Sequence, residues 1–302
     1  MKISKTQLLS TIGEFGLIKS IKGQFVPGRG VIKGIGDDTA VLSELKGNLL
    51  LLTTDMLIEN EHFKSDTNPK DIGYKALACN VSDIAAMGGE PCYAVVSLGI
   101  PKNKRIGYAI GIYRGMLKLA RKYNIKIVGG DTVKHNRVII NIALLGKVKK
   151  KYLVTRDGAR PGDQIFVTGP LGLSYISGRH LTFTPRIKES SFLVRKYPPT
   201  SMIDISDGLV ADLGHILEES KVGALLVEEN IPFIPGAKLK DALYGGEDFE
   251  LVFTLPAKLA GKLKRSSIGF FHIGEITRKK GLQLLRKSGS KEKLTLKGYT
   301  HF

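Results

Sequence analysis

The sequence predicts an α+β protein, an α/β sandwich built of two domains, and three features of the chain support this prediction. Short apolar strands alternate with amphipathic helices through the first half. A charged stretch containing Gly and Pro, residues 147–161, interrupts this alternation, and such a composition is typical of a domain boundary. The alternation then begins again with an apolar run at 164–168. We therefore expect an N-terminal domain of residues 1–150 and a C-terminal domain of residues 151–302.

The individual elements follow from the spacing of apolar residues. The first fifteen residues have the pattern of an amphipathic helix, with Ser4 as its N-cap. Apolar residues at i, i+3, i+4 and i+7 predict helices at 71–87, 106–123 and 209–219. Short apolar runs predict strands at 35–42, 49–55, 93–100, 125–128, 138–146 and 164–168.

The first of the two internal helices of the N-terminal half, DIGYKALACNVSDIAAMGG at 71–89, is the segment around which the chain is organised. Its apolar residues share one face, yet Asn80 and Asp83 lie three residues apart and project from the edge of that face. An ionised carboxylate is costly to desolvate unless a cation or hydrogen-bond donors compensate it. Taken alone, the helix is better explained by packing, with Asp83 as a solvated or backbone-bonded edge residue.

Composition and charge narrow the class of protein. Apolar residues make up 42% and charged residues 25%, so a folded globular chain is expected. The N-terminus lacks the apolar core of a signal peptide and no apolar run reaches the length of a membrane span. The two cysteines form no metal-binding spacing, which favours a reduced, cytoplasmic protein. A net charge of +18 without a nucleic-acid-binding motif predicts a solvated basic surface that steers phosphorylated substrates, not a nucleic-acid or membrane partner.

Aspartates recur where hydrophobic strands or helices end, which is where a scaffold holds ligand-binding groups rigidly. Each of them alone is consistent with a turn or a helix cap. Several carboxylates in a strongly basic chain indicate hard cations, and Mg²⁺ prefers oxygen ligands shared with phosphates. The six histidines are scattered, which argues against zinc. The acids concerned are Asp37, Asp38, Asp55, Asp131, Asp204 and Asp207. Hydroxyl groups lie beside three of these sites, on Thr53, Thr54, Thr132 and Ser206.

Glycine-rich segments offer backbone N–H groups to phosphates, most clearly VPGRGVIKGIGDD at 26–38. None of them matches GxxxxGK[ST], and none is a GxGxxG sequence after a strand. Nucleotide binding here would therefore use neither of the two common phosphate-binding fingerprints.

Motifs spread over almost the whole chain make it resemble the thiamine-monophosphate kinase family, within the aminoimidazole ribonucleotide synthetase superfamily. Short motifs such as SDGL and GGD recur across the superfamily, whereas TTDMLIENEHF together with NVSDIAAMGG and GGEDFEL is specific to this family. The segments that carry the resemblance are GDDTAVL at 36–42, LLTTDMLIENEHF at 51–63, the helix at 71–89, IVGGDT at 127–132, TRDGARPGD at 155–163, IDISDGL at 203–209, YGGEDFELVFT at 244–254 and GYTHF at 298–302.

The resemblance implies an N-terminal domain whose strands form a β-barrel across a homodimer, a C-terminal α+β domain, and ATP in a cleft between them. It implies Mg²⁺-dependent transfer of the γ-phosphoryl group of ATP to thiamine monophosphate, giving thiamine diphosphate and ADP. Asp83 and Asp207 are the implied catalytic residues. By motif position, the metal ligands would be Asp37, Thr53, Thr54, Asp55, Asp83, Asp131, Asp204 and Asp207; the ATP contacts Tyr113, Gly130, Asp131, Arg156 and Ser206; and the acceptor contacts His62, Glu247 and Tyr299.

Two other functions remain open at this point. One is another ATP-dependent synthetase of the superfamily, of the aminoimidazole ribonucleotide or selenophosphate type. The Cys-rich or Gly-rich N-terminal segment expected of the selenophosphate type is missing, because residues 1–15 read as a helix. The other is a basic, non-enzymatic binding protein, which would leave the ordered carboxylates unexplained.

Overall fold

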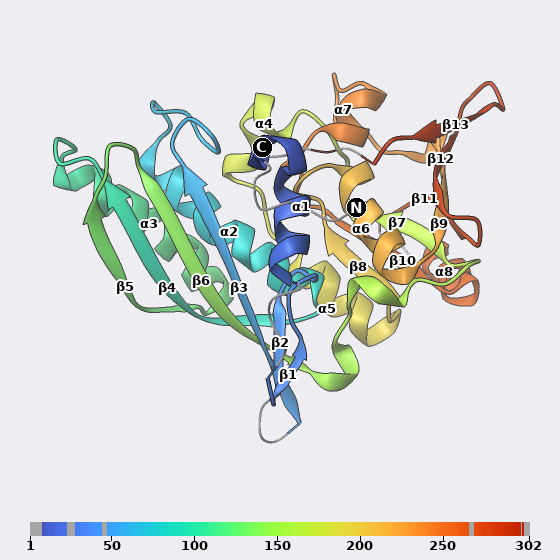
Figure 1. Cartoon of the computed structure of the whole chain (residues 1–302), viewed down its shortest axis with the longest axis horizontal. Helices are drawn as coiled ribbons and strands as arrows, with labels where there is room; N and C mark the ends of the chain where they lie inside the picture. Colours follow the sequence, from blue (N-terminus) through green and yellow to red (C-terminus); the bar gives the residue numbers. More distant parts are fainter. Residues whose placement is uncertain (1–7, 23–27, 44–46, 266–268, 297, 299–302) are drawn as a thin grey trace.

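The chain forms two open β-sheets with a layer of helices between them (Figure 1). The computed structural model describes residues 8–22, 28–43, 47–265, 269–296 and 298. The first sheet and its helices come from the first half of the chain, and the second sheet comes from the second half. The predicted mixture of helices and sheets is therefore confirmed. Within the described residues, neither sheet closes into a barrel.

The first sheet has six strands in the order β1-β2-β3-β6-β4-β5, and only β4 and β5 are parallel neighbours. Helix α3 connects these two strands, as parallel pairing requires. The prediction of a strand at 35–42 was wrong over its first five residues, which form bends ahead of β2, with Gly36 at a φ of 123°. The strands are β1 (Val31–Lys33), β2 (Ala40–Ser43), β3 (Asn48–Ile58), β4 (Glu90–Ile100), β5 (Lys126–Lys134) and β6 (Ile139–Lys149).

Helices α2 (Pro69–Ala86) and α3 (Ile106–Tyr123) cover one face of this sheet. Helix α2 begins with Pro69 in its first turn, and the side chain of Asn68 accepts a hydrogen bond from the backbone N–H of Lys70. The two helix backbones approach very closely, since a Cβ on Gly73 would lie 1.9 Å from the carbonyl oxygen of Ile112. Only glycine fits such a contact, which fixes the two helices against each other.

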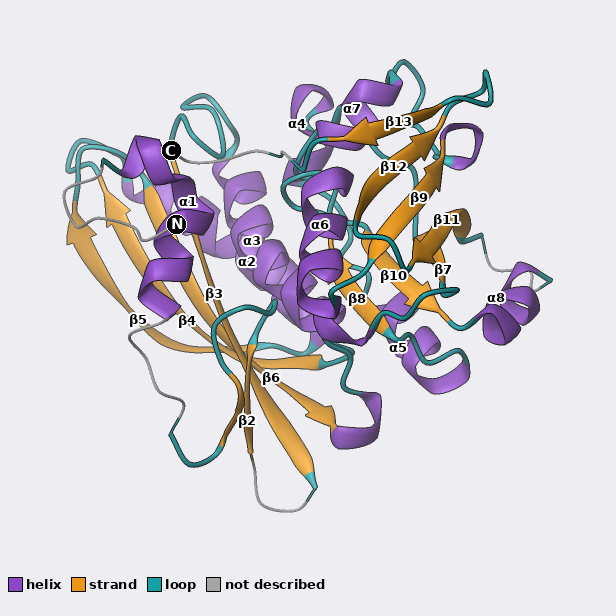
Figure 2. Cartoon of the chain, turned by 45° about the vertical axis from the view of Figure 1, so that its right-hand side comes forward, coloured by secondary structure: helices purple, strands orange, loops and turns teal. Residues whose placement is uncertain are grey.

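Helix α2 is buried more completely than its apolar spacing predicts, with fourteen of its eighteen residues buried. It packs on β3 and β6 of the first sheet and also on β8 and α5 of the second half (Figure 2). A helix enclosed from several sides need not show an amphipathic pattern. Helix α2 is thus the wall that both halves of the molecule share.

The second sheet has seven strands in the order β13-β12-β9-β11-β7-β10-β8, in which only β9 and β12 are parallel. One of its faces packs on α6 and α7, and the other on α5 and α8, so that each face has its own hydrophobic core. The elements are β7 (Gln164–Val167), α4 (Ser174–Ser177), α5 (Ile187–Lys196), β8 (Ser201–Asp204), α6 (Leu209–Ser220), β9 (Gly223–Val227), α7 (Leu239–Tyr244), β10 (Leu251–Leu255), α8 (Ala257–Lys264), β11 (Phe271–Thr277), β12 (Gly281–Leu285) and β13 (Lys291–Leu294).

The N-terminal helix and the connection between the halves differ from the prediction in detail. Helix α1 runs over Leu9–Lys22 with a kink at Gly13, and the predicted cap Ser4 lies outside the described residues. The chain passes from the first sheet to the second between Lys149 and Gln164, through two 3₁₀ turns. The division at residue 150 stays a prediction.

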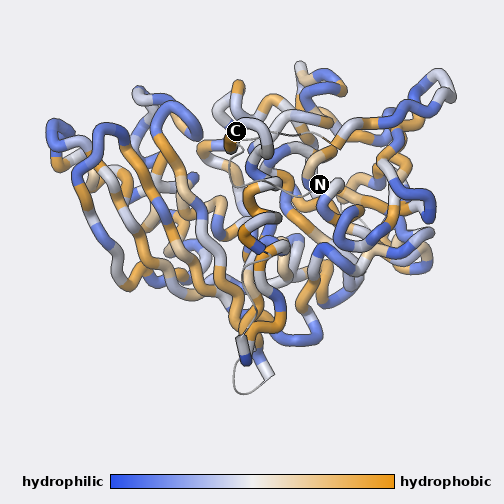
Figure 3. Tube along the Cα trace, in the orientation of Figure 1, coloured by the Kyte–Doolittle hydropathy of each residue, from blue (hydrophilic) through white to orange (hydrophobic). Residues whose placement is uncertain are grey.

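The face of the first sheet that points away from α2 and α3 is apolar and exposed. Hydrophobic runs along β3, β4 and β6 are visible in Figure 3. The exposed side chains on this face include Leu52, Met56, Tyr93 and Val95, with exposed fractions between 42% and 51%. None of the helices in the described part of the chain combines the length and the apolar character needed to cross a membrane.

Candidate active site

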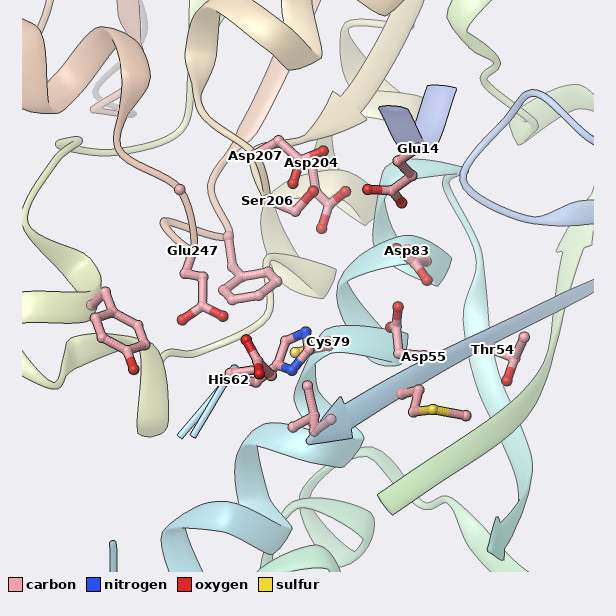
Figure 4. Close-up of a pocket in the computed structure, with 16 residues that line it drawn as sticks. Glu14, Thr54, Asp55, His62, Cys79, Asp83, Asp204, Ser206, Asp207 and Glu247 are labelled. Carbon is pink, nitrogen blue, oxygen red and sulfur yellow. The ribbon is translucent and has the colours of Figure 1, made fainter. Parts of the chain in front are cut away.

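A cavity of about 650 Å³ lies between the two halves, where β3 and α2 face the end of β8 and the segment that precedes β10 (Figure 4). One end of the cavity is dominated by carboxylates, and the other mixes aromatic, histidine and glutamate side chains. Its lining residues are Glu14, Thr54, Asp55, Met56, Leu57, Glu61, His62, Cys79, Asp83, Tyr175, Asp204, Ser206, Asp207, Gly246, Glu247 and Phe249.

The carboxylate end is built by three segments that are distant in sequence. Asp38 follows β1, Asp83 is on α2, and Asp204 is the last residue of β8. A carboxylate oxygen from each of these three residues lies within 4.8 Å of the other two. Asp55, on β3, and Asp207 line the cavity beside them. Both halves of the chain therefore supply acids to one centre.

Hydroxyl groups and one guanidinium orient the three central carboxylates. Thr53 Oγ1 donates to Asp83 Oδ2 at 2.5 Å, because the alternation of β3 turns Thr53 toward α2. Ser82 Oγ donates to Asp204 Oδ2 at 2.6 Å, and Arg156 Nη2 donates to Asp38 Oδ1 at 2.6 Å.

The remaining oxygen of Asp38, Oδ2, is buried and has no hydrogen-bond partner among the described residues. Burying a carboxylate oxygen without a hydrogen-bond partner costs free energy, and a bound cation would offset this cost.

Burial, together with the charges of neighbouring carboxylates, raises the pKa of Asp38, Asp55 and Asp204 to about 6. The pKa of Asp83 is raised well above its usual range by burial and by three neighbouring aspartates. Like charges that are packed this closely resist joint ionisation unless a cation intervenes. A donor set made only of oxygen atoms suits Mg²⁺.

Asp37 lies next to this centre but is turned toward basic groups. Its carboxylate is 3.4 Å from Lys33 Nζ and accepts a hydrogen bond from the backbone N–H of Arg156 at 3.3 Å. The motif GDD offers two adjacent aspartates, and the second, Asp38, is the one that joins Asp83. The pattern of acids includes both aspartates, whereas the family resemblance implies a metal role for Asp37 alone.

At the opposite end of the cavity lie His62 and Glu247, two of the three acceptor-side residues implied by the family motifs. Glu247 has a left-handed backbone conformation, with φ at 65°, and its N–H donates to the carbonyl oxygen of Ser206 at 2.6 Å. Burial opposes ionisation of Glu247, but bonds to His180 and Lys75 outweigh it and hold the pKa of this carboxyl below its usual range. Glu247 is thus a fixed anion at the cavity wall.

Three described residues with implied roles, Tyr113, Gly130 and Asp131, are not drawn into this centre. Tyr113 is half-buried on α3 and packs on the first core. Gly130 and Asp131 lie on β5, the exposed edge strand. Asp131 lies in the same cross-strand row as Met56, a residue that lines the cavity, but three strands away from it. This spacing separates the two residues by about 14 Å. Tyr299 lies outside the described residues.

Two further implied residues lie at the cavity. Thr54 lines it but points to the opposite face of β3 from Thr53 and donates to Asn141 Oδ1 at 3.2 Å. Ser206 lines it beside Asp207.

Glu14, which had no implied role, also reaches the carboxylate end from α1 (Figure 4). Burial raises the pKa of Asp207 to about 6, and the charge of Glu14 is the second-largest cause of this rise. Nothing in the spacing of the N-terminal helix marks this residue.

Comparison with known proteins agrees with this geometry. A family model described as AIR synthase related protein, N-terminal domain, matches residues 36–148. Thiamine-monophosphate kinase of Buchnera aphidicola subsp. Schizaphis graminum (strain Sg) is 36% identical over 328 residues, covering 96% of this chain and 98% of that protein. The enzyme of the same name from Escherichia coli O157:H7 is 35% identical over 324 residues, with the same coverage.

Among solved structures, AaThiL complexed with AMPPCP and TMP superimposes with a TM-score of 0.86. It is 34% identical in sequence, and the match covers 99% of this chain and all of that one. Near-complete coverage at this identity, together with the acidic cavity, leads to one conclusion. The chain belongs to the thiamine-monophosphate kinase family.

Proposed function

We propose that this protein transfers the γ-phosphoryl group of ATP to thiamine monophosphate, forming thiamine diphosphate and ADP. The observation that carries the proposal is one cavity with a cluster of carboxylates at one end and His62 and Glu247 at the other. The carboxylate end suits phosphates and their metal ions, and the opposite end suits a heterocyclic acceptor. The family relationship supports the same reaction.

Magnesium is part of the proposal. Asp38, Asp83 and Asp204 would hold it, with Asp55 and Asp207 beside them, because their oxygens face a common space and one of them lacks a partner. Bound Mg²⁺ would neutralise the developing charge between two polyanionic phosphates. Thr53 and Ser82 hold two of the ligands in place through their hydroxyls. Ser206, which lines the cavity, would contact the nucleotide. Arg156, which donates to Asp37 through its backbone N–H and to Asp38 through its guanidinium, would be a second nucleotide contact.

The reaction requires no general base. The acceptor is a phosphate monoester, which is largely ionised at neutral pH, so its oxygen can attack directly. A covalent route is disfavoured, since burial raises the pKa of the Cys79 thiol well above its usual range. Asp83 and Asp207 therefore act by binding and positioning. Direct in-line transfer follows, in which the bond to the γ-phosphorus forms as the bond to ADP breaks.

We also propose that the protein is a homodimer. The outer face of the first sheet exposes Leu52, Met56, Tyr93 and Val95, and a second copy of the same face would cover them in a shared barrel. Asp131 projects from this face, so the proposed metal and nucleotide roles of Gly130 and Asp131 depend on the dimer. Light scattering at micromolar concentration tests this, and a monomer contradicts it.

Three predictions from the sequence complete the proposal. They are a metal-binding and nucleotide-binding N-terminal domain of residues 1–150, a C-terminal domain of residues 151–302 that completes the cleft, and a cytoplasmic location. Tyr113 would contact ATP and Tyr299 the acceptor.

The deciding experiment measures ATP consumption with thiamine monophosphate and Mg²⁺, and compares thiamine, selenide and formylglycinamidine ribonucleotide as acceptors. The proposal is supported if thiamine monophosphate is turned over and the other three acceptors are not. Turnover with either of the latter two would establish the alternative synthetase function. No turnover with any of them would leave a binding protein, against which the buried carboxylates argue.

A further inference from the structure

Lys75, on α2, is completely buried and lies behind the acceptor end of the cavity. Its ammonium Nζ donates to both carboxylate oxygens of Glu247, at 2.6 and 2.8 Å. It also donates to the backbone carbonyl oxygen of His62 at 2.7 Å and lies 2.8 Å from His180 Nδ1. One cation thus joins His62 and Glu247 to a single helix.

Stability does not account for a lysine at this position. Removing an ammonium group from water is costly, and a well-packed apolar side chain in place of a buried ion pair is often as stable or more so. The neighbouring residues of α2 are mostly apolar or small, so a methionine of similar length would suit the packing. The feature that an apolar residue lacks is the ability to fix Glu247 and the His62 carbonyl.

The location of Lys75 along α2 gives this fixation a consequence for the reaction. Lys75, Cys79 and Asp83 follow one another at intervals of four residues, so they share one stripe of the helix. Eight residues span about 12 Å along a helix axis. Cys79 and Asp83 both line the cavity. The acceptor end and the carboxylate end are therefore held at a fixed separation by one rigid, fully packed element.

Glu247 needs such an anchor. Its left-handed backbone is disfavoured for a residue with a side chain, and conformations of this kind persist only where the surroundings determine them. His180 Nδ1 lies 2.6 Å from Glu247 Oε2 and provides a second contact. With three contacts on its two oxygens, the carboxylate retains acceptor capacity for one further donor from a ligand in the cavity.

We propose that Lys75 is a positioning residue for the acceptor substrate: it holds Glu247 and the His62 backbone in place relative to Asp83, and thereby sets where the acceptor binds. The inference rests on the proposed function. It concerns how the heterocyclic part of the acceptor is oriented, and it leaves ATP and metal binding to other residues.

The test uses Lys75→Met, Glu247→Gln and the double variant of the full-length protein, with steady-state kinetics for thiamine monophosphate and for ATP. We expect the KM for thiamine monophosphate to rise about 30-fold or more in Lys75→Met, because a buried charge loses its partner. The KM for ATP should stay within about threefold of the parent value. The rise in Tm on adding Mg²⁺ should be retained. Arg186→Met, which disrupts a Glu250 ion pair outside the cavity, should leave the KM for thiamine monophosphate unchanged.

The double variant separates positioning from an independent role. If Lys75 acts through Glu247, the KM for thiamine monophosphate of Lys75→Met/Glu247→Gln should be no higher than that of the single variant with the higher KM. Should Lys75→Met fail to fold, the double variant, which leaves no unpaired charge, is compared with Glu247→Gln alone, and equal KM values support the proposal.

An unchanged KM in folded Lys75→Met overturns the inference, and so do effects that multiply in the double variant. A fall in kcat with no change in KM overturns it as well. If the parent protein does not phosphorylate thiamine monophosphate, the proposed function fails and the inference fails with it. An active parent with an unaffected variant refutes the inference alone.

Discussion

Asp55 offers the clearest way to measure the energetic conflict at the carboxylate end. It projects into the cavity from β3, and its carboxylate makes no hydrogen bond with the described residues. Burial, followed by the charge of Asp38, raises its pKa from 3.8 to about 6. At pH 8 without metal, the folded protein must carry this carboxylate ionised at a cost that the unfolded chain does not have. The replacement Asp55→Asn removes the charge while keeping the shape of the side chain.

The size of the effect follows from the shift. A displacement of about 2 pKa units corresponds to about 3 kcal/mol of unfolding free energy, at about 1.36 kcal/mol per unit. An unfolding entropy of about 2.1 cal/mol/K per residue gives about 0.6 kcal/mol/K for this chain. Asp55→Asn should therefore raise Tm in EDTA by up to about 5 °C. The same change should abolish most of the stabilisation that Mg²⁺ gives the parent protein.

The assay is thermal unfolding at pH 8 of the parent and of Asp55→Asn, each in EDTA and in Mg²⁺. Asp66→Asn, at an exposed turn outside the cavity, is the matched control and should behave as the parent in both conditions. A variant that is less stable than the parent in EDTA would show that Asp55 is a packing residue. Equal stabilisation of parent and variant by Mg²⁺ would remove Asp55 from the metal centre.

Four other outcomes follow from the same geometry. In EDTA, the Tm of the parent should be higher at pH 5.5 than at pH 8. Aspartates with folded pKa values of about 6 bind protons at pH 5.5 that the unfolded chain releases, and the resulting stability is lost as the pH rises through 6. Mg²⁺ should reduce this difference in Tm. Activity should vanish in EDTA and return with Mg²⁺, and Asp83→Asn should lower kcat by several orders of magnitude while remaining folded. Thr53→Val should raise the Mg²⁺ concentration for half-maximal activity about 10-fold or more, whereas Thr254→Val, which alters a buried hydroxyl outside the cavity, should not. Met56→Lys on the exposed sheet face should give a monomer by light scattering; a dimer of unchanged affinity would place the interface elsewhere.

Local pattern was sufficient where the element itself determines the direction of the side chain. The period of β3 places Thr53 and Thr54 on opposite faces, and the expected helix at 71–87 agrees with α2 within two residues at its start and one at its end. The aspartates at strand ends were recognisable because buried strands read as apolar runs with an acid at the end. Asp204, at the end of β8, is an example.

Tertiary contacts decided what the pattern left open. Adjacent aspartates in GDD are equivalent in sequence, and only the folded structure places Asp37 beside Lys33 while Asp38 joins Asp83. Lys75 reads as a solvated position between apolar residues, because its partner Glu247 lies 172 residues away along the chain. Edge strand β5 is longer than its apolar run, since an edge with polar and glycine residues carries no alternating signal.

The location of the acids also bears on why two halves of a chain are held together here. Asp38 and Asp83 come from the first half and Asp204 from the second, so repulsion between their carboxylates acts across the contact of the two halves as well as within the cavity. Ser82 Oγ bridges that contact by donating to Asp204, and Arg156 bridges it from the other side by donating to Asp38. A cation bound among the three carboxylates replaces repulsion with attraction at the same place. Metal binding should therefore stabilise the contact between the halves as it prepares the phosphate site, which links the folded state to the catalytic one.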